Sequence, residues 1–174
     1  PEKPTGKPYL YLHGLGKHTA AQPDGPIEEL VRAGSIVLTV DLRGSGETGP
    51  NQETLLGANW DDIFISYLLG RSLLTMRTED TLVCARYLSE LTGDGKPRLI
   101  AVDSAGPPAL HAAALENAVF ASVEIENSLK SWADYLHTPD ARGQMVNVVH
   151  GALQYYDLPD LAASLPEGVA DEDF

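Results

Sequence analysis

The stretch Leu99-Ile100-Ala101-Val102-Asp103-Ser104-Ala105-Gly106 carries the strongest fold signal in the sequence. Its first half is short and continuously apolar, which is typical of a strand buried on both faces of a parallel sheet. Its second half consists mostly of small residues and leads into an alanine-rich segment, 107–115, that is expected to be helical. A sharp turn from strand to helix is therefore predicted, with Ser104 at the turn.

Further strands and helices are expected to alternate on both sides of this stretch. The apolar runs predict strands at 9–12, 35–40 and 120–125, the second of them buried on both faces. Helical spacing predicts a short helix from Pro26 to a stop at Gly34, a long helix over 72–91 and short helices near Trp132 and over 158–165. The long helix is expected to place Met76, Val83, Tyr87 and Leu91 on one face, and 51–62 is expected to be irregular.

Alternating strands and helices imply crossover connections between parallel strands. The predicted fold class is therefore α/β: a three-layer α/β/α sandwich with a mostly parallel central sheet of roughly four strands. Ligands of such sheets bind at the carboxyl ends of the strands. The loops at 13–17, 41–48 and 103–107 are accordingly the places where a site is expected.

The composition predicts a soluble single domain over 1–174. The formal net charge is −13, which disfavours nucleic acid as a partner because phosphates would be repelled. Cys84 is the single cysteine, so an intramolecular disulfide and a cysteine-based zinc site are excluded. No apolar run approaches the ~20 residues of a membrane span, so no membrane contact is expected. The compartment, cytoplasmic or secreted after processing, stays open.

Two glycine-rich segments are similar to phosphate-binding loops, but neither has the required context. Gly44-Ser45-Gly46-Glu47-Thr48-Gly49 matches G-x-G-x-x-G, yet Pro50-Asn51-Gln52 follows it where a helix should begin. Gly16-Lys17-His18-Thr19 is similar to the end of a Walker A loop, but Tyr11 occupies the place of its first glycine. No metal-binding spacing is found either, so no cofactor and no metal are expected.

Two motifs favour nucleophilic catalysis. Ser104 and Gly106 fill the serine and second-glycine places of G-x-S-x-G, while Val102 replaces the first glycine. His13-Gly14-Leu15-Gly16 is similar to an H-G-G-G oxyanion loop, so the predicted donors are the loop at Gly14 and Leu15 and the amide of Ala105. Two interpretations of Ser104 stay open: a nucleophile, or an N-cap of the following helix.

With these motifs the sequence resembles the α/β-hydrolase superfamily, and in particular its acetyl xylan esterase-like branch. The resemblance rests on 9–16, 37–48, 67–77 and 103–115, in the expected order. It implies a carboxylic ester hydrolase, acting for example on acetyl esters of carbohydrates, with Ser104 as the nucleophile. It also implies that Asp41 and Arg43 brace their loop rather than react.

The resemblance ends before the triad acid and histidine, which follow later strands in that superfamily. The chain ends soon after Leu165, so the sequence is expected to be the central part of a hydrolase whose outer strands are missing. His13 and His18 are the only local candidates for a base, because they lie in a neighbouring strand-end loop. The alternatives are one piece of a split hydrolase, or a catalytically inactive binding or assembly module. A homo-oligomer or a second hydrolase fragment is expected to cover the exposed sheet edge.

Overall fold

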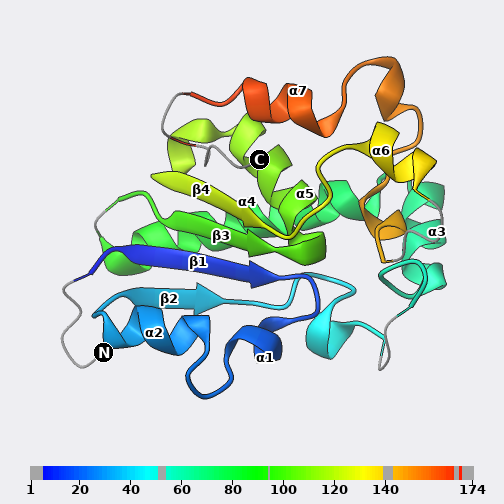
Figure 1. Cartoon of the computed structure of the whole chain (residues 1–174). Coiled ribbons are helices and arrows are strands. Elements are labelled where there is room, and N and C mark those ends of the chain that lie inside the picture. Colours follow the sequence, from blue (N-terminus) through cyan, green and yellow to red (C-terminus); the bar gives the residue numbers. More distant parts are fainter. Residues whose placement is uncertain (1–5, 51–53, 94, 139–142, 167–168, 170–174) are drawn as a thin grey trace.

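A computed structural model describes residues 6–50, 54–93, 95–138, 143–166 and 169 (Figure 1). Within them, four parallel strands form one sheet in the order β2-β1-β3-β4. The strands are β1 (Pro8–His13), β2 (Ile36–Thr39), β3 (Arg98–Val102) and β4 (Ser122–Glu126). The predicted α/β class with a parallel central sheet is confirmed.

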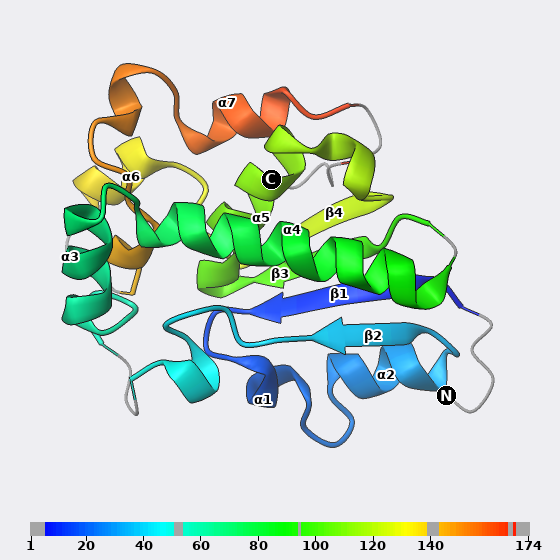
Figure 2. The same cartoon turned by 180° about the vertical axis from the view of Figure 1, so that it is seen from behind.

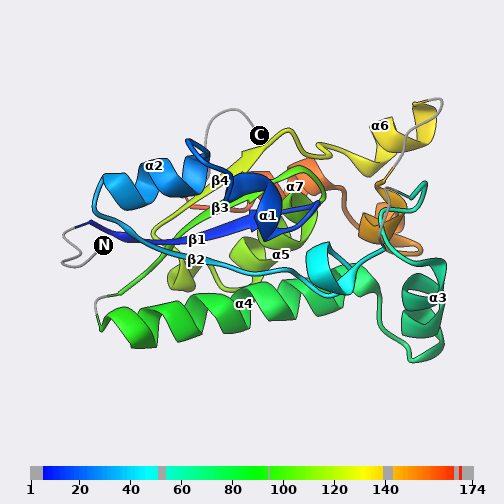
Figure 3. The same ribbon diagram turned by 90° about the horizontal axis from the view of Figure 1, so that it is seen from below.

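Helices cover both faces of the sheet, as Figures 2 and 3 show. Helices α1 (Lys17–Ala20) and α2 (Pro26–Arg32) lie on one face, and α4 (Leu73–Thr92) and α5 (Gly106–Leu115) lie on the other. Side chains of β1 divide between the two layers: Leu10 and Leu12 join the core beneath α4 and α5, while Tyr11 packs with the residues of α1 and α2. This alternation is the period-two pattern of a strand covered on both sides.

The remaining elements surround the carboxyl end of the sheet and the outer side of α5. They are α3 (Trp60–Leu68), α6 (Trp132–His137) and α7 (Leu158–Ala163), with short 3₁₀ turns η1 (Gly46–Thr48), η2 (Asp103–Ala105), η3 (Asn117–Val119), η4 (Met145–Asn147) and η5 (Ala152–Gln154). Helix α7 packs against α5 through a second apolar cluster that contains Leu110, Trp132 and Leu158. Among the described helices, none combines the length and the apolar character needed to cross a membrane.

Strand β2 differs from the prediction of burial on both faces. All four of its residues are only half-buried. The reason is position: β2 pairs with β1 alone and so forms an edge of the sheet. The apolar run predicted the strand correctly but could not tell an edge from the centre.

Helix α4 begins after Ser72, whose hydroxyl accepts the N–H of Thr75, and it spans the predicted range closely. The predicted face was wrong, because Val83, Tyr87 and Leu91 are 61%, 54% and 62% exposed. The buried face instead carries several small or polar residues together with leucines: Leu74, Arg77, Thr78, Thr81, Leu82, Ala85 and Leu88. Small side chains let the helix approach the sheet, so the apolar stripe was not the buried one.

Helix α3 lies partly in the segment expected to be irregular, of which 51–53 fall outside the described residues. Ile63 packs into a core cluster, but most apolar side chains of the helix point outward: Trp60, Phe64 and Leu68 are 62%, 57% and 86% exposed. Trp60 and Phe64 contact each other edge to face, with ring centroids 5.8 Å apart. The prediction of an irregular segment is therefore wrong for its last residues, which begin a helix with an exposed apolar surface.

Candidate active site

The turn after β3 contains a residue with left-handed backbone at the carboxyl end of the sheet. The strand ends at Val102, and the next residue, Asp103, has φ +58°. This is the left-handed region of the backbone, which residues other than glycine seldom adopt. The chain then passes through η2 directly into α5, which begins at Gly106. A strand thus turns sharply into a helix at 103–106, as the sequence predicted.

Close packing explains the small residues on both sides of this turn. Ala101 and Ala105 are 0% and 1% exposed. A methyl group on Gly106 would overlap Ser128 Oγ and lie 2.8 Å from a side-chain carbon of Ile125. Only small residues therefore allow α5 to begin so close to the end of β4.

The structure shifts the turn's centre by one residue from the expected position. The residue with positive φ is Asp103, and Ser104 follows it inside η2. The small residues Ala101 and Ala105 lie two places before and two places after Asp103. Around Asp103 the pattern is small-x-Asp-x-small, whereas around Ser104 one of the two places is Val102.

Ser104 has no capping role here. The N-cap residue of α5 is Ala105, and no side chain accepts a capping hydrogen bond there. The contrast is Ser72, whose hydroxyl does accept the N–H of Thr75 at 3.1 Å. The side chain of Ser104 is nearly closed off, since the residue is 5% exposed. Its carbonyl accepts the Nδ2–H of the fully buried Asn147 at 3.1 Å. This hydrogen bond ties the turn to η4.

Gly14 closes over the turn from the neighbouring strand. Its N–H donates to Val102 O at 3.0 Å, so the pairing of β1 with β3 continues one residue past the strand. A methyl group on Gly14 would overlap Ser104 Oγ and lie 2.6 Å from Ser104 N and 2.8 Å from Asp103 Oδ2. The predicted glycine thus contacts both side chains of the turn, and glycine is the only residue that fits.

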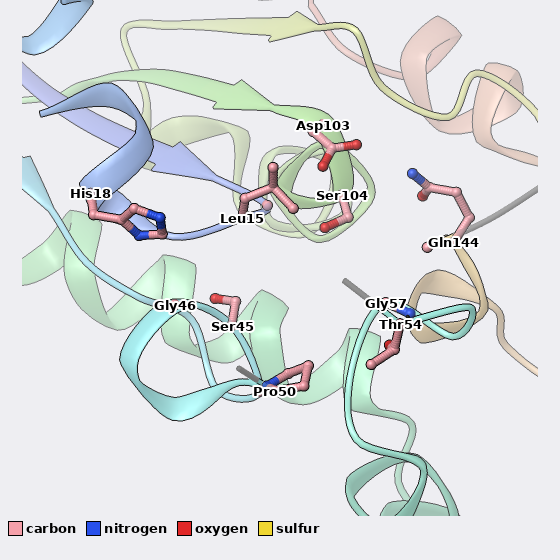
Figure 4. Close-up of a pocket in the computed structure, with 13 residues that line it drawn as sticks. Leu15, His18, Ser45, Gly46, Pro50, Thr54, Gly57, Asp103, Ser104 and Gln144 are labelled. Atoms are coloured by element: carbon pink, nitrogen blue, oxygen red, sulfur yellow. Dashed lines mark hydrogen bonds between the residues drawn. The ribbon is translucent and has the colours of Figure 1, made fainter. Parts of the chain in front are cut away.

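A cavity of about 310 Å³ opens beside the turn (Figure 4). Asp103 and Ser104 lie together on one wall, with Leu15 next to Ser104. The full lining comes from the ends of β1, β2 and β3 and from two later loops: Gly14, Leu15, His18, Gly44, Ser45, Gly46, Pro50, Thr54, Gly57, Asp103, Ser104, Gly143 and Gln144. All three strand-end loops that the sequence predicted therefore meet at one cavity.

The two predicted oxyanion donors are placed differently from each other. Leu15 lines the cavity, but its N–H already donates to His13 Nδ1 at 3.1 Å. Ala105 is buried and lies outside the cavity lining. If Asp103 occupies the reacting position, the donor directly after it is the N–H of Ser104.

The two candidate bases lie near the turn without bonding to it. Burial lowers the pKa of His13, although the nearby Asp103 carboxylate acts in the opposite direction. His18 is exposed on the cavity wall, and in Figure 4 it stands well apart from Ser104 with Leu15 between them. Over the described residues, no hydrogen bond joins a histidine ring to Asp103 or Ser104. The roles of His13 and His18 stay predictions.

Loops braced by charged groups form the opposite wall. Asp41 accepts the Lys17 N–H at 2.6 Å, the Lys17 ammonium at 2.9 Å and the Glu47 N–H at 3.0 Å, which joins the loops after β1 and β2. Arg43 forms an ion pair with Asp80 on α4. Neither Asp41 nor Arg43 lines the cavity, in agreement with bracing roles.

The buried Arg77 supports the same wall from below. Its guanidinium donates to the carbonyls of Arg43 and Gly44 at 2.9 and 3.0 Å. Burial lowers the pKa of Arg77 to about 10. The backbone at Gly44, which lines the cavity, is therefore held by a helix of the core.

Within the described part of the chain, no cluster of three or more histidine, cysteine or acidic side chains could hold a metal ion. The cavity lining presents the carboxylate of Asp103, the imidazole of His18, the amide of Gln144 and the hydroxyl residues Ser45, Thr54 and Ser104.

No protein-family model matches the chain, and no curated protein matches it either. A probable hydrolytic enzyme from Pseudomonas aeruginosa is 19% identical with a TM-score of 0.49, over 75% of this chain and 35% of that one. The 2-hydroxy-6-oxo-6-phenylhexa-2,4-dienoate hydrolase of a Rhodococcus species is 18% identical with a TM-score of 0.47, over 75% and 40%. A carboxyl esterase from Bacillus coagulans is 19% identical with a TM-score of 0.45, over 71% and 37%.

The chain thus spans well under half the length of these three solved structures. At such identities and TM-scores the likenesses carry no conclusion about function, which has to come from the cavity itself.

Proposed function

We propose that the cavity beside the turn is a hydrolytic site for a small organic substrate. The observation that carries the proposal is Asp103, a residue with φ +58° held between a buried strand and a helix on the wall of a cavity. Left-handed backbone at a side-chain-bearing residue costs on the order of 1 kcal/mol, and it gathers at functional sites where the surrounding structure enforces it. Here Gly14 and the buried alanines enforce it.

Carboxylic esters, including acetyl esters of carbohydrates, are the substrate class that the sequence resemblance implies, with Ser104 as the nucleophile. A serine hydroxyl is a poor nucleophile near neutral pH unless a base removes its proton. Because no described histidine bonds to Ser104, this form of the proposal needs an acid and a base from a second chain or fragment.

A binding module without catalysis is the second candidate. The observation that favours it is the burial of Ser104, which is 5% exposed beneath Gly14. In this case the cavity would hold a small ligand, and the strained turn would only shape its wall.

The test compares substrate cleavage by the wild type with that of the double variant Asp103→Asn/Ser104→Ala. The substrates are a short p-nitrophenyl ester and 1-bromohexane, with release of p-nitrophenol or bromide as the readout. All three proteins carry Cys84→Ser, because the thiol would itself release bromide from an alkyl bromide. Ser122→Ala/Asp61→Asn is the matched control, because both residues lie outside the cavity lining. The proposal expects at least one reaction in the wild type and the control and its loss in the double variant. Equal reaction in all three proteins, or none in any, would contradict it.

The predicted partner stays a proposal as well. The exposed apolar face of α3 and the half-buried edge strand β2 support association with a second chain. Light scattering at micromolar protein is expected to show a dimer or a larger species, and a monomer would contradict this expectation.

A further inference from the structure

We propose that Asp103, rather than Ser104, is the side chain that forms a bond to the substrate, and that the substrates are alkylating electrophiles. These are molecules with a leaving group on a saturated carbon, such as an alkyl bromide. The inference rests on the proposed function, namely that this turn is reactive, and it names the reacting atom and the substrate class.

The first argument is the position of Asp103 in the turn. A reactive side chain on a strand-to-helix turn is exposed because its own backbone is strained, and small residues two places away on each side relieve crowding. Asp103 meets both conditions, with φ +58° and with Ala101 and Ala105 as neighbours. Ser104 meets neither, since it is not among the residues with positive φ and has Val102 two places before it.

The second argument is access. Asp103 is half-buried and lines the cavity, whereas Ser104 is 5% exposed. Gly14 packs closely against both side chains, but it lies nearer to Ser104 Oγ than to Asp103 Oδ2, because an added methyl group would overlap the first and lie 2.8 Å from the second. An incoming molecule therefore reaches the carboxylate more readily than the hydroxyl.

The third argument is chemical. An ionised carboxylate has lone pairs for attack and needs no base, whereas the serine hydroxyl must first lose a proton. Among the described residues, no histidine is hydrogen-bonded to Ser104, so Ser104 has no base to remove its proton. Asp103 can attack without one. The carboxylate also fits one class of target. Attack on an acyl carbon would give a reactive anhydride, whereas attack on a saturated carbon gives a stable ester.

The proposed step balances as follows. An Asp103 Oδ atom forms a bond to the saturated carbon, the carbon–bromine bond breaks, and bromide leaves with the electron pair. No proton moves, and the product is an alkyl ester of Asp103. Release of the alcohol would require water to add to the ester carbonyl. Because no described base is positioned for this, the ester is expected to persist on this chain alone, and complete hydrolysis would need a base from a second chain or fragment.

The cavity suits a small uncharged molecule. Glycines form much of its lining, and Leu15 and Pro50 add apolar surface. Its volume of about 310 Å³ is at the lower end of the range of small-molecule sites. A chain of about six carbons is therefore a suitable probe.

The experiment uses the Cys84→Ser background, because Cys84 is the single thiol and would also react with an alkyl bromide. Protein is incubated with 1-bromohexane, and the mass of the intact chain is followed over time. The expected result is a gain of one hexyl group in this background and in its Ser104→Ala variant, with at least a tenfold slower gain in Asp103→Asn. Asparagine tolerates left-handed backbone, so Asp103→Asn is expected to keep the fold, and thermal unfolding checks this.

Two other outcomes would overturn the inference. Labelling that is equally fast in Asp103→Asn would place the reaction elsewhere. Reaction of Ser104 with a fluorophosphonate, together with no hexyl gain, would overturn the assignment of Asp103 while leaving the proposed hydrolytic site intact. No reaction of the folded wild type with either reagent would contradict both proposals.

Discussion

Strands β3 and β4 lie side by side, and each ends in a polar residue with left-handed backbone: Asp103 with φ +58° and Asn127 with φ +49°. Beyond this shared strain the two turns differ. After β3 the chain enters a buried helix at once, and Asp103 lines a cavity. After β4 the chain leaves the sheet as an exposed loop, and Asn127 lies outside the cavity.

The comparison shows that backbone strain alone does not mark a site. Aspartate and asparagine adopt left-handed backbone more readily than other side chains, so Asn127 needs no functional explanation. Asp24, with φ +57°, is a further exposed example. What distinguishes Asp103 is the set of neighbours that enforce its conformation and the space in front of it.

The largest effect is expected from Gly14→Ala, which affects only the turn after β3. The added methyl group would overlap Ser104 Oγ and approach the backbone of the turn. Overpacking of this kind costs about 1–3 kcal/mol of unfolding free energy, and alkylation of Asp103 should be abolished. Denaturant unfolding and intact mass measure the two effects. Gly70→Ala is the comparison, because nothing lies within 4 Å of an added methyl group there and only the backbone cost of a side chain at φ +74° remains, so it should leave labelling unchanged. Unchanged labelling in Gly14→Ala would show that the turn accommodates the methyl group, which would contradict this prediction.

The second effect concerns Asn147, whose Nδ2–H holds the carbonyl of Ser104. Asn147→Ala leaves this buried carbonyl without its donor, at a cost of about 1–3 kcal/mol of unfolding free energy. Asp103 should then be alkylated more slowly, because its turn is less fixed. Asn59→Ala, at an exposed position before α3, is the control. A stability loss without any change in labelling would mean that Asn147 supports the fold but not the geometry of Asp103.

A glycine placed at each turn separates strain from function. Asp103→Gly and Asn127→Gly both remove left-handed strain and both increase the entropy of the unfolded chain, so each should change the unfolding free energy by less than about 1 kcal/mol. Only Asp103→Gly should abolish alkylation. If Asn127→Gly slowed alkylation as much, the contrast between the turns would disappear.

The smallest effect is on acid stability, through Asp41. Burial raises the pKa of Asp41, but hydrogen bonds from Glu47 and Lys17 outweigh it, so that its pKa lies below the ordinary value of 3.8. A lowered carboxyl pKa stabilises the fold above the unfolded-state value, and this stability is lost as the pH falls through the folded-state value. Asp41→Asn should therefore reduce the melting temperature slightly at pH 7 and flatten its decline below about pH 4.

Much of the fold could be predicted because each strand is a short apolar run between turn residues, as 98–102 illustrates. The sequence could not show which face of each helix packs against the core. The pattern of α4 did not reveal that Thr81 and Ala85, rather than Val83 and Tyr87, face the core. Nor could the apolar spacing of α3 tell a surface from a core face.

The sequence could predict which loops line the candidate cavity, whereas the choice of the reacting residue stays a proposal. Gly14, Leu15, His18 and Ser104 do meet at one cavity, because parallel strands bring their carboxyl ends together. The choice between Asp103 and Ser104 depends on a single φ angle, which follows from how α5 packs against β4. That packing depends on tertiary contacts, so the φ angle of Asp103 cannot be predicted from the motif alone.

The most direct test of the central claim is fragment-ion mass spectrometry of the Cys84→Ser chain after a single hexyl group has been added. The account predicts that the fragments place the added mass on Asp103 and that mild base removes it, as expected for an ester. A hexyl group found on Ser104 or on a histidine would contradict the account.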